Sequence, residues 1–363
     1  MESRLISLAH DCNDLHRIKQ VHGHIVRKDL DQSCFDLTKL ISFACSSRGL
    51  STLSVGAVKE GLKHKYYHRS CPQAEEIIAN MMENFTSADQ RVPARIIRMH
   101  FHDCFVRGCD GSILLNSTPV NKAEKDAPPN NPSVKGFELI DQIKEVLENK
   151  CPGVVSCADI LTFAARESVH LSGKFERYQV RGGRKDGKIS RESDALLNLP
   201  PPSANVQLLV QMFANKGLSL EDLVTLSGGH SIGVSHCSSL LGRHVNFSKT
   251  GTHDPTLDFH LAMKLKSECV SVHKAEPTVV VMDRFTPTSL DNKYYKGLLQ
   301  NKGLFTSDQT LLTNTFTRKQ VIANAVQPLA WKKKFVDAMI KMGEIEVLTG
   351  QKGEIRKTCD RVN

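Results

Sequence analysis

Eight cysteines after residue 60 are the feature that most constrains how this chain can fold. Three more precede residue 60, so the 363-residue chain contains eleven. An even set spread over most of a chain predicts four disulfides and an oxidising compartment. A structural zinc site is the alternative, but no C-x2-C pair occurs, which weighs against it. The eight are Cys71, Cys104, Cys109, Cys151, Cys157, Cys237, Cys269 and Cys359.

Apolar residues at helical spacing predict a mainly α-helical domain over residues 61–363. Ser133 and Ser156 precede two of the expected helices and are predicted as their N-caps. A helix near the C-terminus carries Met339 and Met342, which we assign to the core. Alternating strand patterns are scarce, and no internal repeat occurs within 61–363. Residues 1–60 form a separate, short helical extension in this interpretation, with a linker-like composition from 46 to 56.

The chain carries 48 Lys and Arg against 39 Asp and Glu, a net charge of +9. This excess predicts attraction to an anionic surface, either a polyanionic matrix or nucleic acid. The basic residues are scattered rather than clustered, so nucleic acid ranks low, and Lys332, Lys333 and Lys334 are expected on a solvated helix face. No apolar run is long enough to span a bilayer.

Two histidines stand apart from the others, His102 in "RMHFHDC" and His230 in "TLSGGHSIG". Arg98 lies four residues before His102, so both side chains project from one face of the predicted helix. A fixed cation disfavours protonation of a neighbouring imidazole, and a neutral imidazole suits a general base. His100 lies on a different face of the same helix, so the spacing selects His102.

The chain resembles the secretory plant peroxidases, the class III haem peroxidases. The resemblance covers residues 61–363 and rests on "RMHFHDCFVRGCDGS", "VSCADIL", "TLSGGHSIG", "TPTSLDNKYY" and "GLFTSDQTL", in family order and spacing. It implies a mainly α fold with one haem b between a distal and a proximal half. It also implies a monomer that uses hydrogen peroxide to oxidise small phenolic donors to radicals.

The resemblance also implies the roles of the site residues. His230 matches the ligand of the haem iron, and Asp308 the carboxylate that accepts its other ring N–H. His102 matches the distal base that takes a proton from hydrogen peroxide and returns it to the departing oxygen, which is worth roughly 10²–10⁴-fold. Arg98 would stabilise the charge that develops as the O–O bond breaks. The remaining matches are Asn130, which would keep the distal imidazole basic, Phe101, which would shield the haem edge, and Pro200, at substrate access.

Two calcium sites and four disulfides are implied in the same way. Oxygen donors in a tight glycine-containing loop suit a cation that needs 6–8 oxygens, whereas the loop alone would read as a polar turn. The distal site would use Asp103, Asp110 and Ser112 with the carbonyls of Val106 and Gly108, and Glu124 would connect it to the haem pocket. The proximal site would use Ser231, Asp283, Thr286, Ser289 and Asp291. The implied disulfides are Cys71–Cys151, Cys104–Cys109, Cys157–Cys359 and Cys237–Cys269.

Two alternatives remain open at this stage. Residues 1–50 resemble the N-terminus of plant pentatricopeptide-repeat proteins, so an RNA-associated helical-repeat protein is one alternative. The stretch covers little more than one repeat, while such arrays need about three. The other alternative is an inactive fusion that folds poorly. Bound haem distinguishes the peroxidase from both alternatives, because only the peroxidase is expected to contain it.

Export is the expected fate by resemblance, to the extracellular space or the vacuole. The sequons at Asn84, Asn116 and Asn246 agree with export. Residues 1–60, however, lack the apolar run of a secretory signal. We therefore expect a chimera of a repeat-protein fragment and a signal-less peroxidase, retained in the cytosol as written.

Overall fold

The computed structural model describes residues 61–245, 247, 253–269 and 278–363. The chain divides between Val58 and Lys59, and every described residue belongs to the second unit. The N-terminal extension, its repeat-protein resemblance and the sequon at Asn246 lie outside the described residues. Asn84 and Asn116 lie within them.

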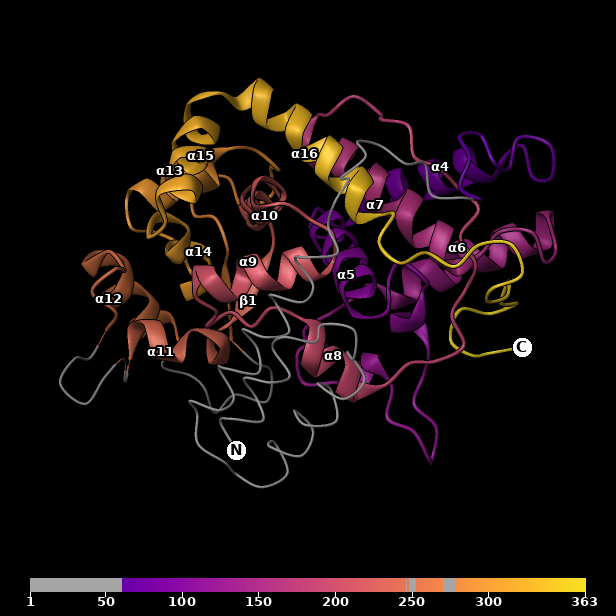
Figure 1. Ribbon diagram of the computed structural model, residues 1–363, viewed down its shortest axis with the longest axis horizontal. Coiled ribbons are helices and arrows are strands. Elements are labelled where there is room, and N and C mark those ends of the chain that lie inside the picture. The colour runs from indigo at the N-terminus through magenta and orange to yellow at the C-terminus, as the bar shows by residue number, and fades with distance from the viewer. Residues whose placement is uncertain (1–60, 246, 248–252, 270–277) are drawn as a thin grey trace, which may run out of the picture. The chain divides into compact units, whose positions relative to one another are not determined.

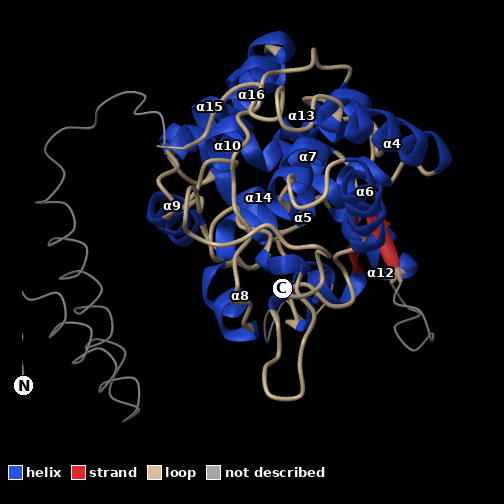
Figure 2. Ribbon diagram, turned by 90° about the vertical axis from the view of Figure 1, so that its right-hand side faces the viewer, coloured by secondary structure: helices blue, strands red, loops and turns tan. Residues whose placement is uncertain are grey.

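Helices dominate the described residues (Figure 1). The two short strands that the structure describes, β1 (Val234–His236) and β2 (Val279–Val281), pair antiparallel (Figure 2). The α-helices are α4 (Ala74–Ala88), α5 (Val92–Val106), α6 (Phe137–Lys150), α7 (Cys157–Gly173), α8 (Glu192–Asn198), α9 (Val206–Asn215), α10 (Leu220–Ser227), α11 (Leu241–His244), α12 (Phe259–Glu268), α13 (Lys293–Leu299), α14 (Thr306–Gln309), α15 (Thr315–Val326) and α16 (Pro328–Met342).

The helices form two groups that share one large core. In the first group α5 and α4 pack on α7, and α4 also packs on α6. In the second, α10 packs on α15 and α16, while α13 packs on α15. Figure 1 shows α4, α6 and α7 on one side and α13, α14 and α15 on the other, with α5 between them. Met339 and Met342 are buried in the shared core, as predicted.

One of the two predicted helix N-caps is confirmed by the structure, and the other is not. The Ser156 side chain accepts a hydrogen bond from Asp159 N, which confirms it as the N-cap of α7. The prediction for Ser133 is wrong, because α6 begins after Gly136, which adopts φ 102° without steric cost. The Ser133 hydroxyl instead donates to the Pro129 carbonyl at 3.2 Å.

The lysine run at the start of α16 is less solvated than predicted. Lys333 is exposed, but Lys332 and Lys334 are half-buried. Lys332 Nζ donates to the Gly173 carbonyl at 2.7 Å, and Lys334 pairs with Glu221 at 2.7 Å. Among the described residues, no helix has the length and apolar character needed to cross a membrane.

Four disulfides cross-link the described chain. Cys157–Cys359 spans 202 residues of sequence and fixes the start of α7 to the C-terminal segment. Cys104–Cys109 closes the short loop after α5. The others are Cys71–Cys151 and Cys237–Cys269, so the four pairs are those that the resemblance implies.

Candidate active site

Helix α5 presents Arg98 and His102 side by side. Arg98 Nε donates toward His102 Nε2 across 3.2 Å. The guanidinium is held from its other side by the Ser133 carbonyl at 3.0 Å, the Ser133 hydroxyl at 2.9 Å and the Pro129 carbonyl at 3.1 Å. Burial lowers the pKa of Arg98 to about 10, so it stays charged at neutral pH.

The opposite ring nitrogen of His102 is fixed by Asn130. His102 Nδ1 lies 2.5 Å from Asn130 Oδ1, and Asn130 Nδ2 donates to the Glu124 carbonyl at 2.6 Å. Because that carbonyl requires a donor, the amide oxygen faces the imidazole and accepts from Nδ1–H. His102 Nε2 therefore carries the lone pair. Burial lowers the pKa of His102 to about 3, the Arg98 charge adds to this effect, and the Asn130 hydrogen bond opposes it.

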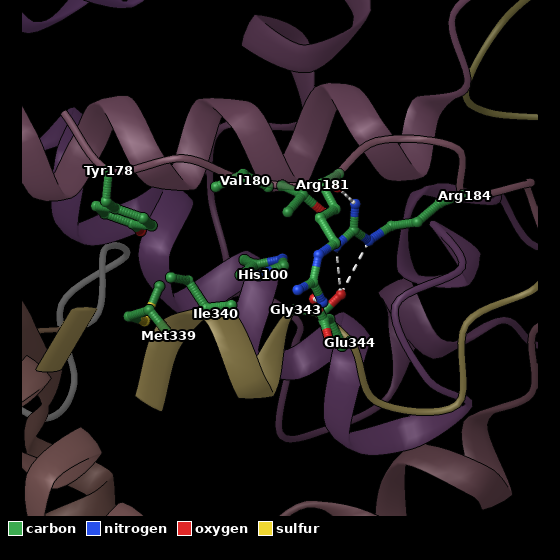
Figure 3. Close-up of a pocket in the computed structure, with 10 residues that line it drawn as sticks. His100, Tyr178, Val180, Arg181, Arg184, Met339, Ile340, Gly343 and Glu344 are labelled. Carbon is green, nitrogen blue, oxygen red and sulfur yellow. Dashed lines mark hydrogen bonds and ion pairs between the residues drawn. The ribbon is translucent and has the colours of Figure 1, made fainter. Parts of the chain in front are cut away.

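His100 has different surroundings. Its ring Nδ1 lies 3.6 Å from Cys104 Sγ. His100 also lines a small cavity with Tyr178, Arg181 and Arg184 from the segment after α7 and with residues of α7 and α16 (Figure 3). Burial, then the Arg184 charge, lowers the pKa of His100 to about 3. His100, Cys104 and Cys109 are close enough to hold a metal ion, but both sulfurs are already in a disulfide.

His230 lies in a short 3-10 turn after α10, and its ring is oriented by Asp308 at the start of α14. His230 Nδ1 and Asp308 Oδ1 are 2.7 Å apart. The other carboxylate oxygen, Oδ2, accepts from Phe305 N at 2.9 Å, and Oδ1 also accepts from the Tyr294 hydroxyl at 2.9 Å. Burial alone would raise the pKa of Asp308, but the charge and hydrogen bond of His230 lower it below the usual value.

These residues fit a haem whose iron is bound by His230. Its Nδ1 is engaged by Asp308, while its Nε2 forms no hydrogen bond with any described residue. The side chain is 43% accessible although its partner Asp308 is buried. An oriented imidazole with one free, accessible nitrogen is the donor that haem iron requires.

Three buried carboxylates lie close together: Asp103 in the last turns of α5, and Asp110 and Glu124 in the segment after it. Within the described part of the chain, the Ser112 hydroxyl and both carboxylate oxygens of Glu124 are buried without a hydrogen-bond partner. Burial raises the pKa of Asp110 to about 6, and burial together with the charges of Asp103 and Asp110 raises that of Glu124 to about 9. Burial, then the Asp110 charge, also raises the pKa of Asp103. Unpartnered oxygens and three neighbouring buried carboxylates fit a bound cation.

The two backbone ligands expected at this cluster already have partners. The Val106 carbonyl accepts from Lys216 Nζ at 3.3 Å, and the Gly108 carbonyl from Asp110 N at 2.8 Å. Each carbonyl has a second lone pair, so both can also bind a cation. Gly108 has φ 91°, which gives the loop its tight turn.

The C-terminal segment closes over this loop. Arg356 is fully buried, and its Nη2 donates to the carbonyls of Gly111 at 2.7 Å and Asp110 at 3.3 Å. Arg356 Nη1 donates to the Cys359 carbonyl. The loop is therefore held by residues from the other end of the domain.

A second group of oxygens follows His230. Asp283 Oδ2 accepts from the Thr286 hydroxyl at 3.0 Å, which also lies 2.9 Å from Asp291 Oδ2. The Ser231 hydroxyl accepts from Asp291 N at 3.2 Å. Burial raises the pKa of Asp283. The structure thus brings these four together, with the exposed Ser289 next to them, bonded through its N–H to the Thr286 carbonyl.

Two further predicted residues are Phe101, expected to shield the haem edge, and Pro200, expected at substrate access. Phe101 is half-buried, with its ring 5.7 Å from that of His102. Pro200 is half-buried in the loop between α8 and α9. That loop is anchored beside α14, because the Pro202 carbonyl accepts from Ser307 N at 3.0 Å.

Sequence reasoning missed two site residues. Ser133 was assigned to a helix cap, and it holds Arg98 instead. Tyr294, in the quoted motif "TPTSLDNKYY", received no role, yet it bonds Asp308. The motif could have pointed to a tyrosine beside Asp308, but it contains two adjacent tyrosines and does not indicate which of them reaches the carboxylate.

Comparisons with known proteins show the family of this chain. A family described as "Peroxidase" matches residues 76–327. The chain is similar to "Peroxidase 5" of Vitis vinifera, at 50% identity over 90% of this chain and 97% of that protein. It is similar to "Peroxidase 3" of Arabidopsis thaliana, at 45% identity over 89% and 99%, and to "Peroxidase 64" of the same plant, at 47% over 84% and 93%.

The mainly helical fold, the family match and the similarity to plant peroxidases identify a haem peroxidase. The chain belongs to the peroxidase family, and it is similar to members from plants. It is an oxidoreductase that uses hydrogen peroxide to oxidise a donor. The comparisons give no support to the RNA-associated alternative.

Proposed function

We propose that His102 and Arg98 perform the acid–base cleavage of hydrogen peroxide. The observation that carries this proposal is the ordered contact of Arg98 Nε, His102 and Asn130. His102 Nε2 accepts the proton of the bound peroxide and returns it to the departing oxygen. The neutral imidazole is available for this because burial and Arg98 keep the pKa of His102 low. Arg98 stabilises the negative charge on the departing oxygen.

One haem b is the cofactor in this proposal, with His230 Nε2 as its iron ligand. The haem would supply redox chemistry, accepting oxidising equivalents from peroxide and passing them on in one-electron steps. Asp308 orients the His230 ring and strengthens it as a donor. In this proposal His102 transfers the protons and His230 binds the iron.

Two calcium ions complete the site in the proposal. The distal ion would bind Asp103, Asp110 and Ser112 with the carbonyls of Val106 and Gly108. Its support is the buried, unpartnered Ser112 hydroxyl and the three gathered carboxylates. Glu124 connects this cluster to the base through the Asn130 amide. The proximal ion would bind Ser231, Asp283, Thr286, Ser289 and Asp291.

Small phenols are the proposed donors, oxidised to radicals near the haem edge that Phe101 shields, with Pro200 at the access path. The four disulfides support an oxidising, extracellular setting. The net positive charge supports contact with an anionic cell-wall matrix. We propose that the protein is a monomer, because all the site residues described come from one chain. We assign the peroxidase domain to residues 61–363, preceded by the repeat-protein-like extension 1–60.

The test compares His102→Ala with His100→Ala in haem-loaded enzyme. His102→Ala should keep its Soret absorbance while its reaction with hydrogen peroxide slows by roughly 10²–10⁴-fold. His100→Ala should slow it little, because that ring contacts a disulfide rather than Arg98 or Asn130. A larger loss in His100→Ala would show that the distal base is misassigned.

A further inference from the structure

One oxygen of the proximal carboxylate serves two donors. Asp308 Oδ1 lies 2.7 Å from His230 Nδ1 and 2.9 Å from the Tyr294 hydroxyl. A carboxylate oxygen only accepts, so both groups donate to it. The His230 N–H therefore shares its acceptor with a phenol.

Packing around Tyr294 and Asp308 fixes this shared hydrogen-bond geometry. Tyr294 comes from α13 and is 5% exposed, with its ring 6.1 Å from the His230 ring and 5.1 Å from the Tyr295 ring. Asp308 is 1% exposed, and Phe305 N holds its other oxygen at 2.9 Å. The carboxylate cannot easily turn to offer the two donors separate oxygens.

A second donor changes what the carboxylate does to the imidazole. Each hydrogen bond to a carboxylate oxygen withdraws part of its negative charge, so that oxygen attracts the His230 proton less strongly. A less strongly attracted Nδ1 proton leaves the imidazole less anionic. The effect on a bound metal is a weaker push of electron density through Nε2.

We propose that Tyr294 is a positioning residue that limits the electron donation of His230 by sharing Asp308 Oδ1. The inference rests on the proposed role of His230 as the haem-iron ligand. It gives the hydroxyl of Tyr294 a role in the enzyme that its neighbour does not have. The Tyr295 hydroxyl instead donates to the backbone carbonyls of Val224 and Thr225, at 2.8 and 3.0 Å.

These adjacent tyrosines supply a matched pair of variants. Tyr294→Phe removes the donor to Asp308, whereas Tyr295→Phe removes a buried hydroxyl of the same kind from the same helix. Two properties of the haem-loaded protein are measured for each variant: the ferric/ferrous midpoint potential and the histidine–iron stretching frequency of the ferrous form. Neither depends on turnover.

In Tyr294→Phe, the ferric/ferrous equilibrium should move toward ferric by about tenfold, which is about 59 mV for one electron. The histidine–iron stretching frequency should rise. Tyr295→Phe should leave both near the values of the unchanged protein. Equal values for the two variants, with the stretch present, would overturn the role of Tyr294 while leaving His230 as the ligand.

A third variant tests the ligand itself. His230→Ala should abolish the histidine–iron stretch, and added imidazole should restore a band. If the stretch persists in His230→Ala, the proposed ligand is wrong, and the role of Tyr294 falls with it. The three variants therefore distinguish failure of the ligand assignment from failure of the tuning.

Discussion

Asn130 Nδ2 lies 2.6 Å from the carbonyl oxygen of Glu124, which links His102, the proposed distal base, to the acidic cluster of Asp103, Asp110 and Glu124. The same amide presents its oxygen to His102 Nδ1. The backbone at Glu124 thus sets the orientation of the amide, and the amide sets which ring nitrogen of His102 is free.

Replacing this amide tests that chain of contacts. In Asn130→Val, His102 Nδ1 loses its acceptor, so the tautomer with a free Nε2 is no longer enforced. We expect the rate of reaction with hydrogen peroxide to fall by roughly 10–100-fold, part of the roughly 10²–10⁴-fold that positioned acid–base groups contribute. Stopped-flow measurement of the haem absorbance gives this rate. Asn130→Asp keeps an acceptor and should lose less, and a greater loss in Asn130→Asp would contradict this role.

Removing calcium should destabilise the domain and its activity together. Without a cation, burial and the neighbouring carboxylate charges raise the pKa values of Asp103 and Glu124, so the ionised cluster is unfavourable until a cation binds. A cation at a hundredfold excess over its Kd adds about 2.7 kcal/mol to the free energy of unfolding. Thermal unfolding and guaiacol oxidation, measured before and after chelation, report the change, and added Ca²⁺ should restore both. Full activity and an unchanged Tm in protein shown by atomic absorption to be calcium-free would exclude the distal site.

His100 should make the domain sensitive to acid. Its pKa is lowered to about 3 by burial and by Arg184, so the unfolded chain binds a proton near pH 6.5 while the folded domain does not. The free energy of unfolding should therefore fall as pH drops from 6.5 toward 3, by at most about 1.4 kcal/mol per pH unit for this group. Arg181, Glu344 and Tyr178 also line the cavity and belong to the same electrostatic environment.

The measurement is urea unfolding of the disulfide-intact domain at several pH values between 7 and 5. His100→Gln should reduce the slope of unfolding free energy against pH, because the replaced group does not titrate. His64→Gln, at an exposed position, provides the comparison. Identical slopes in the two variants would rule out His100 as a source of the acid sensitivity.

The disulfide Cys157–Cys359 should contribute more stability than Cys237–Cys269. Their sequence separations are 202 and 32 residues. The loop-entropy estimate is roughly 5 kcal/mol for the longer loop and roughly 4 for the shorter. Paired Cys→Ser variants, compared by denaturant unfolding, give the two losses. A greater loss for the shorter loop would show that strain or residual structure outweighs chain entropy here.

A contact between two residues can be predicted from local sequence patterns when both residues lie in the same helix or strand. Arg98 and His102 are four residues apart in α5, so helical geometry alone predicts their contact. Asn130 and Asp308 reach the histidines from 28 and 78 residues away, and local patterns do not predict such contacts. Family motifs supplied both expectations.

Other features could not be predicted because two sequence signals compete. Ser133 is a good N-cap residue, but Gly136 takes the left-handed conformation and starts α6 three residues later. The adjacent Tyr294 and Tyr295 differ only in the direction that α13 gives them, and only one reaches Asp308. Tertiary packing decided both cases.

The clamp of Arg356 on the loop after α5 sets an order of events during synthesis. Its contact with the Gly111 carbonyl joins residues made 245 positions apart. A nascent chain that has already produced α5, with its arginine and histidine, still lacks the residue that closes the loop behind them. The Arg356 contacts that close this loop can therefore form only after Arg356 has left the ribosome.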